Sequence, residues 1–391
     1  MARLCVVSFK ECWPGGDGRW YSSGGIPVQM AGLASLFDET TLVVVGTEPH
    51  EGGMPLPAGA RVVPLRPPTG TDFRRKLSIA GRLPSLLRVI ARECRRADVV
   101  HTPLPGDIPL LGFGVALALR KPLLARYGGS WTQTSASTLM NRVTRQCMRF
   151  AARGRNVMIA TGAGARPPAR GMTWLFASAI SREEVSGIHP DLDRPRGHPL
   201  RLVYAGRLSS EKGVQHLIGA LAALRRRNGK APLPRLVLVG DGPQRTALAR
   251  AVQAGGIQDL VEFRGQLARA SLLEELCRSD VCVLPSLTES FCKARLDAML
   301  CGVPVVTTPV GFGRELVGAD GERGWIVPAG DEPALASQLE MLAHGPGDWS
   351  AIRRRSRAFA EGFTIEGWTE RLAETCARRW GGPLMSEAVH P

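Results

Sequence analysis

The chain has 391 residues, more than the roughly 250–300 at which a single core stops growing, so two domains are expected. Hydrophobic residues make up 44% and charged residues 22%, which excludes a disordered chain, and no run reaches the ~18 apolar residues of a membrane-spanning helix. The net charge of +15 is uneven: residues 1–198 hold 26 Lys+Arg against 14 Asp+Glu, and residues 199–391 hold 24 against 21. This asymmetry predicts an anionic partner for the first half: a membrane surface, a phosphorylated acceptor or nucleic acid.

The first residues, MARLCVVSFKECW, lack a long apolar segment followed by a small-residue cleavage site. We therefore expect a cytoplasmic protein. Nine cysteines form no Cys-x-x-Cys pair, and their spacings are not those of a zinc site. Reduced, mostly buried thiols and no metal are expected.

Apolar runs suited to buried parallel strands alternate with helical segments through residues 1–187. Such alternation predicts an α/β domain with a doubly wound parallel sheet. The expected strands are LCVVSF (4–9), TLVVVG (41–46), DVVH (98–101), PLLARY (122–127), NVMIAT (156–161) and TWLFAS (173–178).

Residues 188–199 are the expected linker, because this stretch is rich in proline and has no periodicity. A second alternating series predicts another doubly wound domain over residues 200–362. Its expected strands are 201–206, 235–240, 261–265, 281–286, 303–308 and 324–328, with helices near 213–227, 243–255, 269–278 and 292–301. Ligands of such domains bind near the carboxyl ends of the strands and in the cleft between domains.

Three strand ends of the second half carry groups suited to a diphosphate. AGRLSSEKG (205–213) places Arg207 and Lys212 beside a helix start, where a guanidinium and an ammonium favour phosphate. VGDGPQR (239–245) and TPVGFGRE (308–315) are glycine-bearing turns whose backbone can approach a ligand closely. Singly, each is also typical of solvated charges or a tight turn.

A fourth strand end, PSLTESFCKARLDAMLCGVPVVTT (285–308), carries Glu289 and Asp297 eight positions apart. Eight positions are just over two helical turns, so both carboxylates can face one pocket. Paired carboxylates suit a hydroxyl-rich ligand, with one on a sugar and the other on a ribose diol. A helix cap and a solvated helix face would give the same pattern.

In this order and spacing, residues 201–345 resemble the donor domain of family 4 of the retaining glycosyltransferases. The signature of that family is Glu, seven residues, Glu, then Ala-Met-x-x-Gly-x-Pro-Val-Val, and the matching run here starts at Glu289 and ends at Val306. The resemblance implies the GT-B fold, in which two Rossmann-like doubly wound domains face each other across an interdomain cleft. It also implies that a C-terminal helix, residues 363–384, crosses back to the first domain.

The resemblance implies roles for individual residues. Arg207 and Lys212 match the pair that grips the donor diphosphate and stabilises the leaving group, which is electrostatic catalysis. Glu289 matches the glutamate that contacts the transferred sugar, so these three are the expected catalytic residues. The expected donor-binding residues are Gly25, Gly206, Asp241, Gly242, Phe291, Cys292 and Asp297.

The resemblance further implies retention without a protein nucleophile, a donor phosphate oxygen taking the acceptor proton. No metal and no cofactor are expected beside the donor, a UDP- or GDP-sugar. Two positions depart from the family: Asp297 stands where a longer glutamate usually binds the ribose, and Arg295 stands where the family often has an apolar residue.

The resemblance is weaker before residue 200. Gly25 lies in a glycine-rich turn that would approach the donor phosphate, and a plain turn is equally open. His101 fits the first histidine of a frequent His-x-His, with Pro103 at the second position, and a structural histidine is equally open. Arg126 ends a strand on the acceptor side of the predicted cleft.

Residues 72–98 combine arginines with leucine and isoleucine and are interrupted by Pro84. Two interpretations stay open: two amphipathic helices resting on anionic lipid, or a packed helix pair with a solvated arginine face. A second basic run, residues 141–156, also favours contact with anionic lipid.

The sequence thus predicts a retaining glycosyltransferase that moves a hexose-type sugar to a hydroxyl of a saccharide or lipid-linked acceptor. Its expected setting is polysaccharide or glycolipid biosynthesis at the inner face of the cytoplasmic membrane. Asp297 and Pro103 keep open a weak or inactive glycosyltransferase-like partner subunit. The charge of +15 keeps open a basic nucleic-acid-binding protein, although only 6% of residues are aromatic and no nucleic-acid partner is expected.

Overall fold

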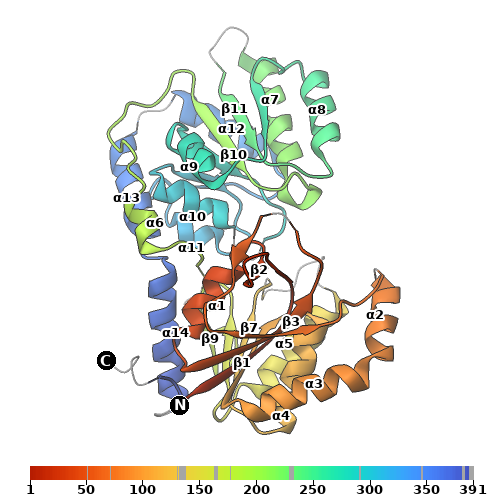
Figure 1. Cartoon of the computed structure of the whole chain (residues 1–391). Coiled ribbons are helices and arrows are strands. Elements are labelled where there is room, and N and C mark those ends of the chain that lie inside the picture. The colour runs from red at the N-terminus through yellow and green to blue at the C-terminus, as the bar shows by residue number, and fades with distance from the viewer. Residues whose placement is uncertain are drawn as a thin grey trace. The chain divides into compact units, whose positions relative to one another are not determined.

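The apolar runs of the chain form two sheets, and each sheet belongs to its own unit (Figure 1). The first unit comprises Met1–Ser181 and Thr364–Pro391, and the second comprises Arg182–Phe363. This computed structural model describes residues 1–50, 52–70, 72–129, 131, 138–162, 166–176, 178–228, 233–289, 292–344, 347–380 and 384–386. None of the described helices is long and apolar enough to cross a membrane.

The sheet of the first unit is mostly parallel. Its strands are β1 (Arg3–Pro14), β2 (Trp20–Ser22), β3 (Glu39–Gly46), β4 (Met54–Pro55), β5 (Arg61–Leu65), β6 (Val99–Leu104), β7 (Leu123–Tyr127), β8 (Val157–Ala160) and β9 (Met172–Trp174). The parallel strands lie in the order β5-β3-β1-β6-β7-β8-β9, and β2 and β4 extend the end of β1 as antiparallel strands. This order is a doubly wound one, with a change of direction between β1 and β6.

Both faces of this sheet are buried, which explains why its strands are continuous apolar runs. Along β1, Leu4 and Val6 enter one core cluster, and Cys5 and Val7 enter the other, as the two-residue period of a strand requires. Helices cover the two faces: α1 (Ile26–Ala34), α2 (Asp72–Gly81), α3 (Leu83–Arg96), α4 (Asp107–Ala118) and α5 (Leu139–Ala151).

The last described helix, α14 (Ile365–Trp380), also belongs to the first unit (Figure 1). Its Trp368 and Leu372 enter the same core cluster as Leu33 of α1. The indole of Trp380 donates a hydrogen bond of 2.8 Å to the carbonyl of Arg155. These contacts attach the C-terminal helix to the first sheet.

The second unit holds a fully parallel sheet in the order β12-β11-β10-β13-β14-β15. Its strands are β10 (Arg201–Ala205), β11 (Arg235–Val239), β12 (Val261–Gly265), β13 (Val281–Leu284), β14 (Val305–Thr307) and β15 (Gly324–Ile326). The order is that of a Rossmann fold, so its switch point lies between β10 and β13. Ligands are expected at the carboxyl ends of these two strands.

The helices of the second unit follow its strands. They are α6 (Arg182–Ser186), the 3-10 turn η1 (Ser210–Lys212), α7 (Val214–Asn228), α8 (Arg245–Ala254), α9 (Arg269–Cys277), α10 (Lys293–Leu300), α11 (Gly313–Val317), α12 (Glu332–His344) and α13 (Trp349–Glu361). The stretch 188–199 contains no helix or strand, and its Arg194 donates a hydrogen bond of 2.9 Å to Asp280 of the second unit.

The expected strands are found, and those expected at 156–161, 173–178, 281–286, 303–308 and 324–328 are shorter by two or more residues. The short antiparallel strands β2 and β4 were not expected. Strand β5 was missed because it is a sheet edge that pairs with β3 and contains Pro64, and proline masks the pattern of an edge strand. The segment 72–98 forms two helices, α2 and α3, with Pro84 in the first turn of α3, where its missing N–H costs little.

Candidate donor-binding site

The carboxyl ends of three strands in the second unit are joined by hydrogen bonds between their loops. The N–H of Leu287, after β13, donates to the carbonyl of Glu211, after β10, at 2.9 Å. The hydroxyl of Thr308, after β14, donates to the carbonyl of Ser286 at 2.6 Å. Gly213 takes a left-handed φ of 69°, and a side chain there would overlap the carbonyl of Pro285. The loops on either side of the switch point are therefore fixed to one another.

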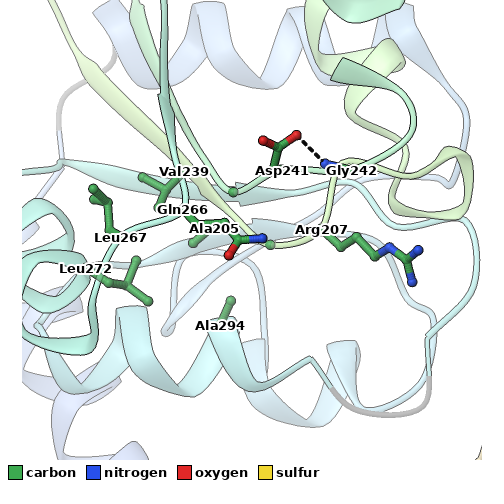
Figure 2. A pocket seen from close by; sticks show the side chains of 11 residues that line it. Ala205, Arg207, Val239, Asp241, Gly242, Gln266, Leu267, Leu272 and Ala294 are labelled. Atoms are coloured by element: carbon green, nitrogen blue, oxygen red, sulfur yellow. Dashed lines mark hydrogen bonds between the residues drawn. The ribbon is translucent and has the colours of Figure 1, made fainter. Parts of the chain in front are cut away.

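A pocket of about 790 Å³ opens at the carboxyl ends of β10 and β11, and neither Lys212 nor Glu289 is among the residues that line it. Its walls come from the ends of β10 and β11, from the loop after β12, and from α9 and α10. In Figure 2 the apolar side chains of Leu267 and Leu272 lie at one end of the pocket and the guanidinium of Arg207 lies at the other. The lining residues include the predicted Gly206, Arg207, Asp241 and Gly242.

Arg207 is held by a buried tyrosine. The hydroxyl of Tyr204 donates a 2.8 Å hydrogen bond to the carbonyl of Arg207. Burial raises the pKa of Tyr204, so the phenol keeps the proton that this bond needs. The backbone at the start of the loop is therefore fixed, whereas the Arg207 side chain stays exposed to solvent.

Lys212 and Glu289 form an ion pair across the joined loops. Their side chains keep 23% and 12% of their exposure, so the pair is largely shielded and still reachable. Burial raises the pKa of the nearby Cys292 thiol. The positive charges of Arg295 and Lys212 act against this rise, and the negative charge of Glu289 adds to it. These four residues therefore share one electrostatic environment.

Asp297 does not line the pocket; Ala294, one turn earlier on α10, does. The carboxylate of Asp297 is buried, and Arg269 contacts both of its oxygens, at 2.9 and 2.7 Å. Arg269 also donates to Glu184 at 2.6 Å. Burial would lower the pKa of Arg269, but the two carboxylates outweigh it and raise that pKa. Asp297 is therefore already paired with Arg269, and a ribose that bound to Asp297 would have to share or displace that arginine.

Arg295 is fully buried beneath the loop after β14. It donates to the hydroxyl of Thr307 at 3.0 Å and to the carbonyl of Val310 at 3.2 Å. Its remaining Nη2 is buried without a hydrogen-bond partner, and no carboxylate pairs with it among the described residues. A buried guanidinium in this state is costly and supplies positive charge to the loop above it.

Two other predicted donor residues are Cys292 and Phe291. Cys292 is the buried residue before α10, and its side chain makes no capping hydrogen bond to that helix. Phe291 lies outside the described residues.

The predicted residues of the first unit lie together near the start of α1. Gly25 precedes this helix, and a Cβ there would lie 2.7 Å from that of Ala179. Arg126 donates a 3.0 Å hydrogen bond to Gln29 of α1, and burial lowers its pKa to about 10, so it stays cationic at neutral pH. His101 is buried in β6 with Nδ1 2.9 Å from the carbonyl of Leu124.

Burial and the charge of Arg126 lower the pKa of His101 to about 3. The imidazole is therefore neutral at physiological pH, with Nδ1–H donating to the Leu124 carbonyl. A neutral histidine fixed inside a sheet is well suited to a structural role, one of the two interpretations that the sequence left open.

Sequence reasoning missed several residues of the site. Gln266, Leu267 and Leu272 line the pocket, but their segment has no charge or glycine pattern that marks a ligand. Arg269 is 28 positions from its partner Asp297, and no local motif connects them. Arg295 gave a signal, a charged residue at an apolar position, but not the location of its guanidinium.

Solved structures define the class of the fold. The chain superimposes on sucrose-phosphate synthase from Thermosynechococcus elongatus with a TM-score of 0.70 and 19% identity, covering 97% of this chain and 100% of that one. It superimposes on Anabaena HepE, solved in complex with UDP and glucose, with a TM-score of 0.68, 18% identity and the same coverage. The fold is GT-B, built from two Rossmann-like domains, and the predicted fold class is confirmed.

The second half can be assigned more narrowly. Residues 199–374 match the family model described as Glycosyl transferases group 1. Glycogen synthase of Mycobacterium tuberculosis (strain CDC 1551 / Oshkosh) is 35% identical over 173 residues, which are 44% of this chain and 40% of that protein. The 2-deoxystreptamine N-acetyl-D-glucosaminyltransferase of Streptomyces fradiae is 35% identical over 156 residues, 40% of this chain and 36% of that protein. The chain thus spans about two fifths of the length of these curated relatives, and its similarity to group 1 glycosyltransferases lies in the second half.

Proposed function

We propose that this protein is a retaining glycosyltransferase that moves a hexose-type sugar from a UDP- or GDP-sugar to a hydroxyl acceptor. The acceptor is a saccharide or a lipid-linked saccharide in polysaccharide or glycolipid synthesis. One observation carries the proposal: the Lys212–Glu289 pair lies on loops joined to the Arg207 pocket, in a domain that matches group 1 glycosyltransferases.

The pocket supports a nucleotide-sugar donor because its two ends differ in chemistry. The apolar end, with Leu267 and Leu272, suits a nucleobase, and the exposed guanidinium of Arg207 suits the diphosphate. The complex of HepE with UDP and glucose is consistent with such a ligand in this fold.

In this proposal the cations act while charge separates at the anomeric bond. As the bond to the donor phosphate breaks, positive charge develops on the sugar and negative charge on the departing diphosphate. Arg207 and Lys212 would stabilise the negative charge as it develops, and Glu289 would hold a hydroxyl of the transferred sugar. Two cations on the diphosphate make a metal ion unnecessary in this scheme. A donor phosphate oxygen takes the acceptor proton, so attack on the same face retains the anomeric configuration.

The first test is thermal stabilisation by UDP-, GDP-, ADP- and dTDP-sugars and by the free nucleotides. A ligand of the native state stabilises it by about 2.7 kcal/mol at a hundredfold excess over Kd. We expect a shift with one nucleotide family. If no nucleotide raises the Tm, the donor site is misplaced, and the nucleic-acid alternative gains weight.

The second test measures transfer with that donor. NMR of the product determines whether the anomeric configuration is retained, and EDTA in the assay determines whether turnover needs a metal. Inversion would contradict the retaining scheme, and loss of turnover in EDTA would contradict the metal-free one. Donor binding without transfer to any acceptor tried would favour the inactive-partner alternative.

A further inference from the structure

The positive charge of the first half is concentrated in one stretch. Residues 108–182 contain eleven Lys or Arg and no Asp or Glu, whereas the rest of residues 1–198 holds 15 basic and 14 acidic residues. Arg126 and Arg145 of this stretch are buried, but the exposed cations, Arg142 and Arg149 among them, have no acidic neighbour in sequence and attract an anionic surface.

Helix α5 lies within this stretch and exposes apolar side chains to solvent. Leu139 is 75% exposed, Phe150 70%, Val143 43% and Met140 36%. These are four of the eleven large hydrophobic side chains that are exposed among the described residues. Four such residues on one 13-residue helix form a patch rather than scattered exposure.

The helical period places these side chains on one stripe. At 3.6 residues per turn, Leu139, Val143, Phe150 and Met140 fall within an arc of roughly 100°. Arg142 and Arg149 fall on the adjoining exposed arc, within roughly 20° of each other, and Arg153 follows the end of the helix. The guanidinium of Arg153 lies 4.0 Å from the ring of Phe150. The opposite arc, which includes Thr144 and Met148, is buried in the first unit.

An apolar stripe beside an arginine row is the pattern of a helix that lies in the surface of a bilayer. We infer that α5 docks on a membrane rich in anionic lipid, with Leu139 and Phe150 inserted among the acyl chains and the arginines at the headgroups. Charge alone would also attract a nucleic acid, but the exposed aliphatic side chains favour lipid.

Segment 72–98, the other basic region, fits a membrane less well. The buried carboxylate of Glu93 is paired with Arg61, Arg92 and Arg96, so part of the arginine charge is neutralised within the unit. Arg75 pairs with Asp107 at 3.1 Å. Within 72–98, Leu77 is the exposed large hydrophobic side chain among the described residues.

The membrane face also adjoins a pocket. Met140 lines a pocket of about 640 Å³ together with Phe9, Lys10 and Arg75. A lipid-linked acceptor held in the bilayer would reach this pocket from the membrane face; this last step rests on the proposed function.

Vesicle co-sedimentation of the full-length protein tests the inference. We expect binding to phosphatidylglycerol/phosphatidylcholine vesicles and about tenfold or greater loss of binding in the double variant Leu139→Ser/Phe150→Ser. Arg142→Gln and Arg149→Gln should each weaken binding about fivefold at low salt. The matched control is Leu77→Ser/Met341→Ser, which also removes two exposed apolar side chains and should bind as the natural protein does.

Three results would overturn the inference: no binding to anionic vesicles, equal binding to pure phosphatidylcholine, or unchanged binding of Leu139→Ser/Phe150→Ser. If the protein binds oligonucleotides as tightly as vesicles, and the double substitution leaves oligonucleotide binding unchanged, the basic surface serves nucleic acid instead. The double variant should keep its Tm and its stabilisation by the donor nucleotide. Donor binding and vesicle binding therefore fail separately, and each failure identifies the proposal that is wrong.

Discussion

The two Rossmann-like units share a strand order but use their strand ends differently. In the second unit, the charged side chains after β10 and β13 stay accessible: Arg207 lines a pocket, and Lys212 and Glu289 pair with each other. In the first unit, the titratable side chains of β6 and β7 point into the protein, where His101 is neutral and Arg126 is bound to Gln29. The same topology thus gives exposed charge in one sheet and satisfied, buried polar groups in the other.

The carboxyl end of a strand identifies where a site can form, and burial determines which side chains can act there. A strand end is a ligand site only where loops keep the polar groups at the surface of a pocket. We therefore expect substitutions in the second unit to change turnover and donor binding, and those in the first sheet to change stability.

The largest expected effect is on turnover. Lys212→Ala and Glu289→Ala should each lower kcat by about 10²–10³-fold, because in the proposed mechanism Lys212 stabilises the developing charge and Glu289 holds the sugar. Steady-state kinetics with the donor found by thermal shift would measure this loss. Arg225→Ala breaks an exposed ion pair with Asp259 in the same unit and is the matched control. Near-normal kcat in both site variants would show that the catalytic centre lies elsewhere.

The ion pair between Arg269 and buried Asp297 gives the next largest effect. Arg269→Met should lower the free energy of unfolding by about 3 kcal/mol, because it leaves the buried carboxylate of Asp297 without its cation. Urea denaturation would measure the loss. The double variant Arg269→Met/Asp297→Asn should recover part of it, since no buried charge remains. If the single variant unfolds like the natural protein, Asp297 is free to bind a ligand instead.

His101 gives the corresponding test in the first unit. Its pKa of about 3 in the folded protein lies below the ~6.5 of an unfolded histidine, so the unfolded chain binds more protons between these values. Stability should therefore fall as pH decreases through this window, by about 2 kcal/mol from this group at pH 5. His101→Gln should reduce the difference in unfolding free energy between pH 7 and pH 5 by that amount.

His344→Gln makes the same change of side chain at an exposed position and is measured as the matched control. Turnover of His101→Gln is measured beside it. A large loss of kcat with no change in the pH dependence would contradict the structural role and restore His101 as an acceptor-side residue.

The fold and the positions of the donor loops were predictable because their signals are local. Buried parallel strands read as apolar runs, and the cations and glycines of the site stand within a few residues of a strand end, as in 205–213. Burial and distant pairing have no local signal. His101 lies in one predictable strand and Lys212 follows another, and only the packed chain shows that the first is neutral inside the sheet and the second is paired with Glu289. The exposed stripe of α5 was likewise hidden, since its apolar residues look like core residues until burial is known.

The weakest effect is expected on nucleotide affinity, and it should distinguish two buried arginines of the second unit. Arg353 is paired with Asp280 at 3.3 Å, whereas Arg295, under the loop after β14, has no carboxylate partner among the described residues. If its charge serves the donor diphosphate, Arg295→Met should weaken binding of the nucleoside diphosphate about tenfold and leave binding of the nucleoside unchanged. Calorimetric titration with both ligands would measure this difference.

The Tm should separate the two variants in the reverse order: the variant that weakens nucleotide binding should keep its Tm, and the other should lose stability. Arg295→Met replaces a costly buried charge with an apolar side chain of similar length, so the Tm should change little. Arg353→Met removes a cation from buried Asp280, so the Tm should fall while nucleotide affinity stays the same. If Arg295→Met instead weakened nucleoside and diphosphate binding equally, Arg295 would act on the shape of the pocket and not through its charge. The loop after β14 would then be positioned mainly by the bonds of Arg295 to Thr307 and Val310.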